Sequence, residues 1–410
     1  MVHSPTGKQR LGLALLLGML CALGPFNIDM YLPSLPQIAD DFETHASFVQ
    51  LSLTACLFGL AIGQIIVGPI SDAVGRRKPI LIFISLFALA SLLCAFAPNI
   101  IVLVIARFLQ GFTASAGIVL SRAVVRDVFN GKELTKFFAL LMVINATGPM
   151  IAPISGGAIL LLPFATWHTI FMFLFLFGII IVTIVAFKLK ETLPESKRVP
   201  ASIGQSIRTM GSLLKDRTFI GYAIVVGFVQ GGTFAYVAGT PFVYQDIYNV
   251  SPQMFSILFG INGLAIISGS FLVGRLSGII HERTLLRTGV IVSLCANTTL
   301  LVMTIIQGPI AMLVIPIFIH LLSIGIILTS SFSLAMEHQS KRAGSASALL
   351  GMLPLLVGSM IAPLIGINET TAIPMGASLF TTSAIGAIAF FTLTRQRKNQ
   401  TQQTEVVVEG

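Results

Sequence analysis

The basic residues of this 410-residue chain alternate with its apolar segments. Twelve long apolar segments follow one another, and 24 of the 25 Lys and Arg residues fall in alternate gaps between them or at the two ends. Membrane proteins keep their short basic loops on the cytoplasmic side of the bilayer. The pattern therefore predicts an even number of crossings of the cell (inner, cytoplasmic) membrane, with both termini in the cytoplasm.

Composition excludes several other classes of protein. Hydrophobic residues make up 55% of the chain, charged residues only 10%, and the mean hydropathy is +0.92, far above the range of soluble proteins. The formal net charge of +9 is spread over seven stretches, so it does not predict a nucleic-acid partner. The sequence carries no Gly-rich ATP loop, no catalytic triad and no metal-ligand spacing. We therefore expect neither an enzyme nor a bound metal or cofactor.

Helices are the expected form of the apolar segments, because lipid offers backbone groups no partners and the segments lack the two-residue alternation of strands. A crossing needs about 20 residues. On this basis we predict an all-α polytopic membrane protein with twelve transmembrane helices, at about 11–35, 47–70, 79–97, 100–121, 137–162, 168–188, 219–244, 254–276, 285–306, 310–335, 345–366 and 371–393.

Two related halves are indicated by a weak internal repeat. A shift of 206 to 208 residues places Pro33 on Pro241 and Gly68 on Gly274. Two pseudo-symmetric six-helix bundles are typical of transporters that work by alternating access. The predicted units are an N-terminal bundle, a cytoplasmic linker, a C-terminal bundle and a disordered cytoplasmic tail, at 1–190, 191–217, 218–394 and 395–410.

Asp29 and Arg107 are the candidates for proton coupling. Asp29 is the only acidic residue deep in a predicted helix, and Arg107 is the one basic residue outside the alternating pattern. Both lie about 10 Å from the outer surface by the rise of a helix. Burial disfavours an ionised carboxyl group, whereas a nearby guanidinium favours it, so the pair is suited to loading and releasing a proton. The alternative is a buried ion pair that only fixes helix packing.

The turn after the second predicted helix has the composition of a salt-bridged conformational latch. Topology alone would explain its positive charges, but an acid among them indicates more. Asp127, at the end of the fourth predicted helix, is a further anion within reach. The latch candidates are Asp72, Gly75, Arg76, Arg77 and Asp127.

The fifth predicted helix carries small residues and prolines at regular spacing. They permit close helix approach and bending, and ordinary tight packing is the alternative. The set consists of Gly148, Pro149, Pro153, Gly156 and Gly157.

Polar residues within the predicted helices supply candidates for a substrate cavity, although interhelical hydrogen bonds would also explain them. They are Tyr31, Gln110, Asn145, Gln230, Tyr236 and Asn262. His320 is a candidate for a proton relay, with local hydrogen bonding as the alternative.

These motifs together resemble the major facilitator superfamily. The stretch from Gly68 to Lys78 is similar to its loop signature G-x-x-x-D-x-x-G-R-R/K, and Arg107-x-x-Gln110-Gly111 is similar to its fourth-helix signature. The resemblance implicates Arg107 in proton transfer. The fifth helix resembles the exporter signature, with Ala152 in place of a Gly.

The first helix resembles that of the bicyclomycin/chloramphenicol-resistance (Bcr/CflA) drug:proton antiporters. The resemblance rests on Ile28-Asp29-Met30-Tyr31-Leu32-Pro33, and on Glu191-Thr192-Leu193-Pro194 after the sixth helix. It implies that Asp29 alternately holds a proton and yields to substrate. The chain lacks the second first-helix acid of related exporters, and Gly278 stands where a second Asp72 would be.

The expected function is therefore export of small amphipathic drugs, such as bicyclomycin- or chloramphenicol-like compounds, in exchange for protons. The alternative is proton-coupled transport of a metabolite such as a sugar or an amino acid. The expected partners are the substrate, protons and the lipid bilayer, and we expect a monomer. A receptor or membrane enzyme would need an extramembrane domain, and no loop is long enough to form one.

Overall fold

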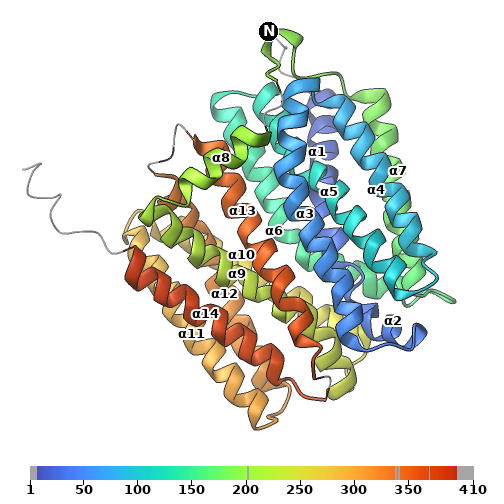
Figure 1. Cartoon of the computed structure of the whole chain (residues 1–410), viewed down its shortest axis with the longest axis vertical. Helices are drawn as coiled ribbons and strands as arrows, with labels where there is room; N and C mark the ends of the chain where they lie inside the picture. The colour runs from blue at the N-terminus through green and yellow to red at the C-terminus, as the bar shows by residue number, and fades with distance from the viewer. Residues whose placement is uncertain (1–6, 201–202, 338, 340–341, 369, 395–410) are drawn as a thin grey trace, which may run out of the picture.

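The computed structural model describes residues 7–200, 203–337, 339, 342–368 and 370–394, and this part of the chain is helical without any strand (Figure 1). The predicted tail, 395–410, lies outside the described residues. The elements in order are α1 (Gly7–Asp29), η1 (Leu32–Ser34), α2 (Leu35–Asp41), α3 (Ala46–Val74), α4 (Arg77–Ala95), α5 (Ile100–Val128), α6 (Gly131–Ile159), α7 (Trp167–Lys188), η2 (Glu195–Lys197), α8 (Ile203–Leu213), α9 (Arg217–Phe242), η3 (Val243–Ile247), α10 (Pro252–Leu276), α11 (Glu282–Ile305), α12 (Ala311–Met336), α13 (Ala343–Ile365) and α14 (Ile373–Leu393).

The prediction of an all-helical, multi-pass membrane protein is confirmed. Within the described residues, eleven helices are long and apolar enough to cross a membrane. The remaining long helix, α6, has 29 residues and coincides with the fifth predicted crossing. Polar caps fix several helix starts: the side chain of Asn99 accepts a hydrogen bond from the N–H of Val102, and Asp216 caps α9 in the same way.

The long helices form two bundles that lie side by side (Figure 1). One bundle contains α1 and α3–α7, and the other contains α9–α14. Close contacts made by glycine repeat between the halves: Gly111 of α5 lies on the main-chain carbonyl of Cys56 in α3, and Gly325 of α12 lies on that of Ile266 in α10. Each contact joins the second and fourth long helices of its bundle, so the two bundles pack in a similar way at these positions.

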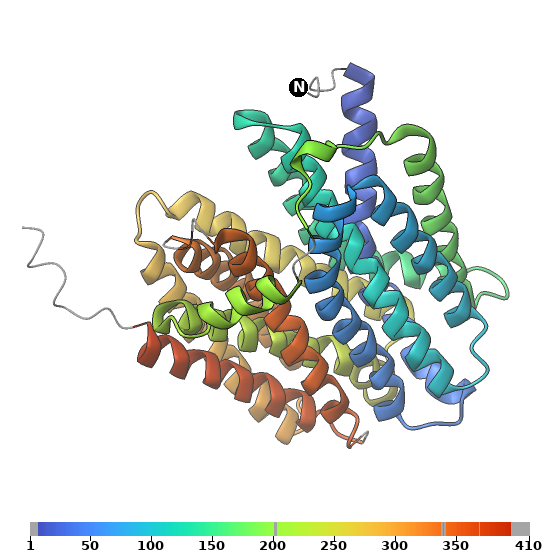
Figure 2. The same ribbon diagram turned by 45° about the horizontal axis from the view of Figure 1, so that its top comes forward.

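Two helix pairs join the bundles: α3 packs against α13, and α6 packs against α10. The segment with η2 and α8 crosses from one bundle to the other at one end of the molecule (Figure 2). We call this end, which also holds Arg76 and Asp127, the linker end, and the end with Trp167 the far end. At the far end Gln50 Nε2 donates to the carbonyl of Ala238 (3.2 Å), and Gln245 Nε2 donates to that of Pro33 (3.2 Å). The far ends of the two bundles are therefore in contact.

The first predicted helix, 11–35, proves not to be a single helix. α1 ends at Asp29, and a short 3-10 turn, η1, leads into α2. Pro33 has no N–H group to donate to the carbonyl of Asp29, four residues earlier, and its ring crowds that carbonyl, so it favours a helix break here, although α6 continues through two prolines. The break puts Asp29 at a helix end rather than in a helix middle.

Candidate functional site

Asp29 lies at the broken end of α1, between the two bundles. Only 4% of the residue is exposed. Among the ion pairs and hydrogen bonds of the described residues, none involves its carboxyl group. A buried carboxylate without a partner is costly, whereas a protonated carboxyl group is tolerated far better.

Arg107 of α5 is completely buried beside this helix end. Its Nη1 donates to Asn27 Oδ1 (2.8 Å) and Gln110 Oε1 (2.6 Å), and its Nη2 donates to the main-chain carbonyl of Asn27 (2.8 Å). Its guanidinium carbon lies 4.2 Å from the ring centroid of Tyr31, in cation–π geometry. Arg107 therefore caps the end of α1, where the helix dipole favours a cation.

The structure brings Asp29 and Arg107 into electrostatic range of each other without an ion pair. The two residues are neighbours, as the matching depths predicted. The alternative of a buried ion pair that fixes packing is not what this conformation contains. Arg107 is instead held by neutral oxygen atoms, and no cation among the described residues is bonded to Asp29.

The second bundle faces Asp29 with Tyr236 of α9, which is close enough to interact with it electrostatically. The hydroxyl of Tyr236 accepts a hydrogen bond from Asn262 Nδ2 of α10 (2.9 Å), and its ring stacks on Phe259 with centroids 4.9 Å apart. Asn262 Oδ1 is buried and has no hydrogen-bond partner among the residues that the structure describes. An unsatisfied buried acceptor on the side chain bonded to Tyr236, the residue that faces Asp29, is a suitable anchor for a ligand donor.

The glycines of α6 bring α1 and α10 close to it. Gly148 lies on the ring of Pro25, Gly156 on the main-chain carbonyl of Met30, and Gly157 on the side chain of Ser256 in α10. Pro149 and Pro153 lie inside the same helix. The motif therefore forms a three-helix contact at the level of Asp29, as close helix approach requires.

The other cavity candidates lie in different surroundings. Tyr31 and Gln110 are buried inside the first bundle, where Gln110 also donates to Ser91 Oγ (2.8 Å). Gln230 of α9 is partly exposed. The side chain of Asn145 lies outside the described part of the structure. Substrate contact by these residues remains a prediction.

His320 belongs to a polar cluster within the second bundle. Its Nδ1 lies 3.0 Å from Ser293 Oγ and 3.1 Å from Asn297 Nδ2, and its Nε2 lies 3.5 Å from Thr233 Oγ1. Within the described residues, its hydrogen bonds join it to no acidic group. This placement corresponds to the local hydrogen-bonding alternative.

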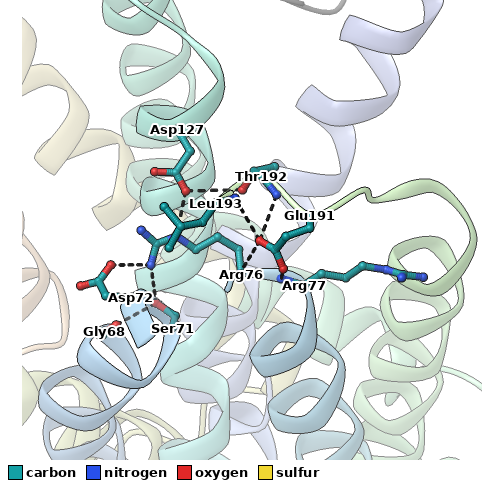
Figure 3. A network of polar contacts seen from close by, with 9 residues as sticks. All are labelled: Gly68, Ser71, Asp72, Arg76, Arg77, Asp127, Glu191, Thr192 and Leu193. Atoms are coloured by element: carbon teal, nitrogen blue, oxygen red, sulfur yellow. Dashed lines mark hydrogen bonds and ion pairs between the residues drawn. The ribbon is translucent and has the colours of Figure 1, made fainter. Parts of the chain in front are cut away.

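A second polar network lies at the linker end, around Arg76 (Figure 3). Arg76 Nε donates to Asp127 Oδ2 (2.8 Å), and its Nη1 donates to Asp72 Oδ1 (2.6 Å) and Ser71 Oγ (2.7 Å). Only 3% of the Arg76 side chain is exposed, against 11% for Asp127 and 40% for Asp72. Arg77 points elsewhere: its Nη2 donates to the carbonyl of Ala186 in α7 (2.7 Å). One cation therefore joins the ends of α3 and α5.

Glu191 completes this network, and it was not among the predicted site residues. Its Oε1 accepts from the main-chain N–H groups of Arg76 (2.7 Å), Thr192 (3.0 Å) and Leu193 (3.0 Å). Its Oε2 accepts from the N–H of Arg77 (3.1 Å), so the carboxylate caps the start of α4 (Figure 3). Burial alone would raise the pKa of Glu191, but these N–H groups stabilise its charged form and the net pKa is lowered.

Gly75 makes room for that carboxylate. Its φ of +96° belongs to the region that favours glycine, and a Cβ at this position would meet the carboxyl group of Glu191. The only sequence signal for Glu191 was its place in the stretch Glu191-Thr192-Leu193-Pro194.

Two surface hollows lie at the linker end, away from Asp29. One, of about 730 Å³, is lined by residues of α8, and the other, of about 420 Å³, lies between the first turns of α1 and α6. Neither hollow is lined by a predicted site residue. The candidate site is therefore assigned from the buried charges of Asp29 and Arg107, and not from these hollows.

Comparison with known proteins places this site in a family context. The family model described as Major Facilitator Superfamily matches residues 15–363. An uncharacterized MFS-type transporter, YdgK, of Bacillus subtilis is 69% identical over 98% of this chain and 100% of its own length. A bicyclomycin resistance protein homolog of Haemophilus influenzae is 31% identical over 93% of this chain and 95% of its own. A solved structure of a bacterial homolog of the lysosomal transporter Spinster, in an inward-facing and unoccupied conformation, is similar with a TM-score of 0.75 and 14% identity over 96% of this chain and 100% of that one.

Proposed function

We propose a specific activity for this chain, which belongs to the major facilitator superfamily and is a multi-pass membrane transporter: it exports small amphipathic drugs in exchange for protons. The motif resemblance to the superfamily and to its bicyclomycin-resistance branch is confirmed by these matches. The choice of drugs as substrate and of protons as coupling ion is the proposed part.

Asp29 is the observation that carries the proposal. It is a buried acid at a helix break, no cation of the described residues is bonded to it, and it faces Tyr236 of the opposite bundle. Acids of this kind inside membrane segments are expensive and mark ion or substrate pathways. A proton on Asp29 would neutralise its carboxylate, and a drug with a donor group would replace that proton.

Alternating access would follow from rocking of the two bundles about their shared contacts. In this conformation α3–α13 and α6–α10 join the bundles, and the far ends are linked through Gln50 and Gln245. We propose that the linker end faces the cytoplasm and that the far end is the outer surface. The network around Arg76 would then be the cytoplasmic latch, because it ties α3, α4 and α5 to the linker.

We further propose the inner membrane as the location, both termini in the cytoplasm, and a monomer as the working unit. The four units at 1–190, 191–217, 218–394 and 395–410 would act as bundle, linker, bundle and tail. Substrate, protons and lipid are the proposed partners, without a cofactor or nucleic acid.

Transport of a sugar or an amino acid with protons is the alternative. The glycine contacts of α6 and the bicyclomycin-resistance relative favour a drug.

The test is accumulation of radiolabelled chloramphenicol in everted membrane vesicles energised by a proton gradient. We expect uptake that a protonophore abolishes and that Asp29→Asn reduces to the level of empty vesicles, with the variant still inserted in the membrane. Uptake of labelled sugars or amino acids in place of drug would support the alternative. Undiminished uptake by Asp29→Asn would overturn the assignment of the coupling acid.

A further inference from the structure

Asn27 binds the guanidinium of Arg107 through two oxygen atoms. The side-chain Oδ1 accepts from Nη1, and the main-chain carbonyl accepts from Nη2, each at 2.8 Å. Asn27 is itself completely buried, and its Nδ2 donates to Cys56 Sγ at 3.0 Å. The carbonyl is free to accept because α1 ends at Asp29 and the next main-chain N–H groups lie outside the helix.

Asn27 and Asp29 occupy the same last turn of α1 and offer the same cation different oxygens. Asn27 offers two neutral acceptors, and Asp29 offers a carboxylate that forms none of the ion pairs of the described residues. A charged acceptor attracts a guanidinium more strongly than a neutral one. Within the described part of the chain, the Nε of Arg107 is buried and has no hydrogen-bond partner, so the guanidinium is not saturated in this conformation.

We propose that Asn27 is a positioning residue that competes with Asp29 for Arg107, holding the guanidinium at the end of α1 while Asp29 is protonated and releasing it when Asp29 ionises. This inference rests on the proposed coupling role of Asp29. In this arrangement Arg107 has two alternative sets of acceptors within one helix turn. The proton affinity of Asp29 then depends on Asn27, although Asn27 carries no charge.

The titratable groups around the pair do not supply another switch near neutral pH. Arg107 faces Tyr31, which follows α1, Cys56 of α3 and Cys94 of α4, while Asp29 faces Tyr236 of α9. Tyr and Cys side chains ordinarily ionise above pH 8. From α6, Gly156 touches the main chain of Met30, next to Asp29, and from α10, Asn262 bonds to Tyr236; neither Gly156 nor Asn262 titrates.

The test is an infrared pH titration of the purified full-length chain in lipid, following the band of the protonated carboxyl group. In every variant the band is assigned to Asp29 by subtracting the same protein with Asp29→Asn. The measurement needs no substrate. A protein that titrates as expected but moves no drug would refute the proposed function and leave the competition between Asn27 and Asp29 standing.

Two substitutions at position 27 should move the titration midpoint in opposite directions. Asn27→Ala frees the guanidinium for ionised Asp29 and should lower the midpoint by about one to two pH units, as loss of one charge-assisted hydrogen bond of about 1.5–3 kcal/mol implies. Asn27→Asp keeps the shape, engages Arg107 with a fixed carboxylate and repels Asp29, so it should raise the midpoint by a similar amount.

The matched control is Asn297→Ala, which removes a buried asparagine bonded to Ser383 in the second bundle, away from Arg107. It should leave the midpoint unchanged. Because Asn27→Asp changes no more than the amide group, it remains informative if Asn27→Ala fails to fold. The proposal would be overturned if the titration midpoint of Asp29 is unchanged in both position-27 variants, or if it shifts in the same direction in both.

Discussion

Gly156 of α6 lies against the main-chain carbonyl of Met30, the residue after Asp29, so closely that a Cβ at position 156 would overlap that oxygen. The exporter-type glycine thus touches the main chain beside the proposed proton site. Gly156→Ala should push α1 and α6 apart and reduce proton-driven drug uptake about tenfold, because overpacking a tight contact costs about 1–3 kcal/mol. Uptake by everted vesicles measures this.

Gly274→Ala in α10 is the control for that substitution. A Cβ at position 274 would meet no other atom within 4 Å. The variant should transport like the wild type, since alanine is the better helix former. Equal transport by both alanine variants would show that the contact between Gly156 and Met30 has no role in the transport cycle.

Asp127 and Asp72 share Arg76 but should not contribute equally to the latch. Asp127 is nearly buried, whereas Asp72 is 40% exposed. Removing one partner of a buried ion pair leaves a costly unpaired charge, while an exposed pair contributes little. Asp127→Asn should change the labelling rate of a single Gly351→Cys thiol about fivefold, and Asp72→Asn less than about twofold. Position 351 reports on the interface because it faces Gln64 of α3. Equal effects would contradict this ranking.

The helices were predictable because a bilayer leaves apolar segments few alternatives. The fourth crossing was predicted at 100–121, and α5 begins at Ile100, where Asn99 supplies a cap. Its end, at Val128, was missed, since the length of a crossing predicts only the part of a helix that lies within lipid. The break of the first helix at Asp29 was also missed, although Pro33 and Pro36 were visible in the sequence.

The charged members of the site were recognisable because a charge in an apolar segment is unusual. Asn27 and Glu191 were not, since Asn27 carries no charge, Glu191 lies in a polar loop, and the role of each depends on a partner distant in the chain. Asn27 meets Arg107 across 80 positions, and Glu191 meets Arg76 across 115. Only the folded arrangement shows which backbone groups are left open to them.

Glu191 should make the stability of the linker end depend on pH. Its pKa is lowered in the folded chain, so its stabilisation is fully present above the unfolded value of about 4.3 and is lost as pH falls through the folded value. Glu191→Gln keeps one acceptor oxygen but carries no charge. The thermal midpoint of the wild type in detergent should exceed that of Glu191→Gln at pH 7, and the difference should shrink below about pH 4. A difference that stays constant with pH would assign the effect to shape rather than charge.

Substitutions of Arg107 would show whether proton-driven uptake needs only its positive charge or also the geometry of its guanidinium. Its two terminal nitrogens donate to three acceptors, and its flat guanidinium lies over Tyr31. A lysine ammonium is a point charge without this fork, so Arg107→Lys would lose at least one charge-assisted hydrogen bond of about 1.5–3 kcal/mol. We expect Arg107→Lys to reduce proton-driven uptake about tenfold or more, close to the loss in Arg107→Ala.

Substantial uptake by Arg107→Lys would mean that charge suffices. Normal uptake by Arg107→Ala, with an unshifted pH profile, would make Arg107 a packing residue, and coupling would then depend on Asp29 alone.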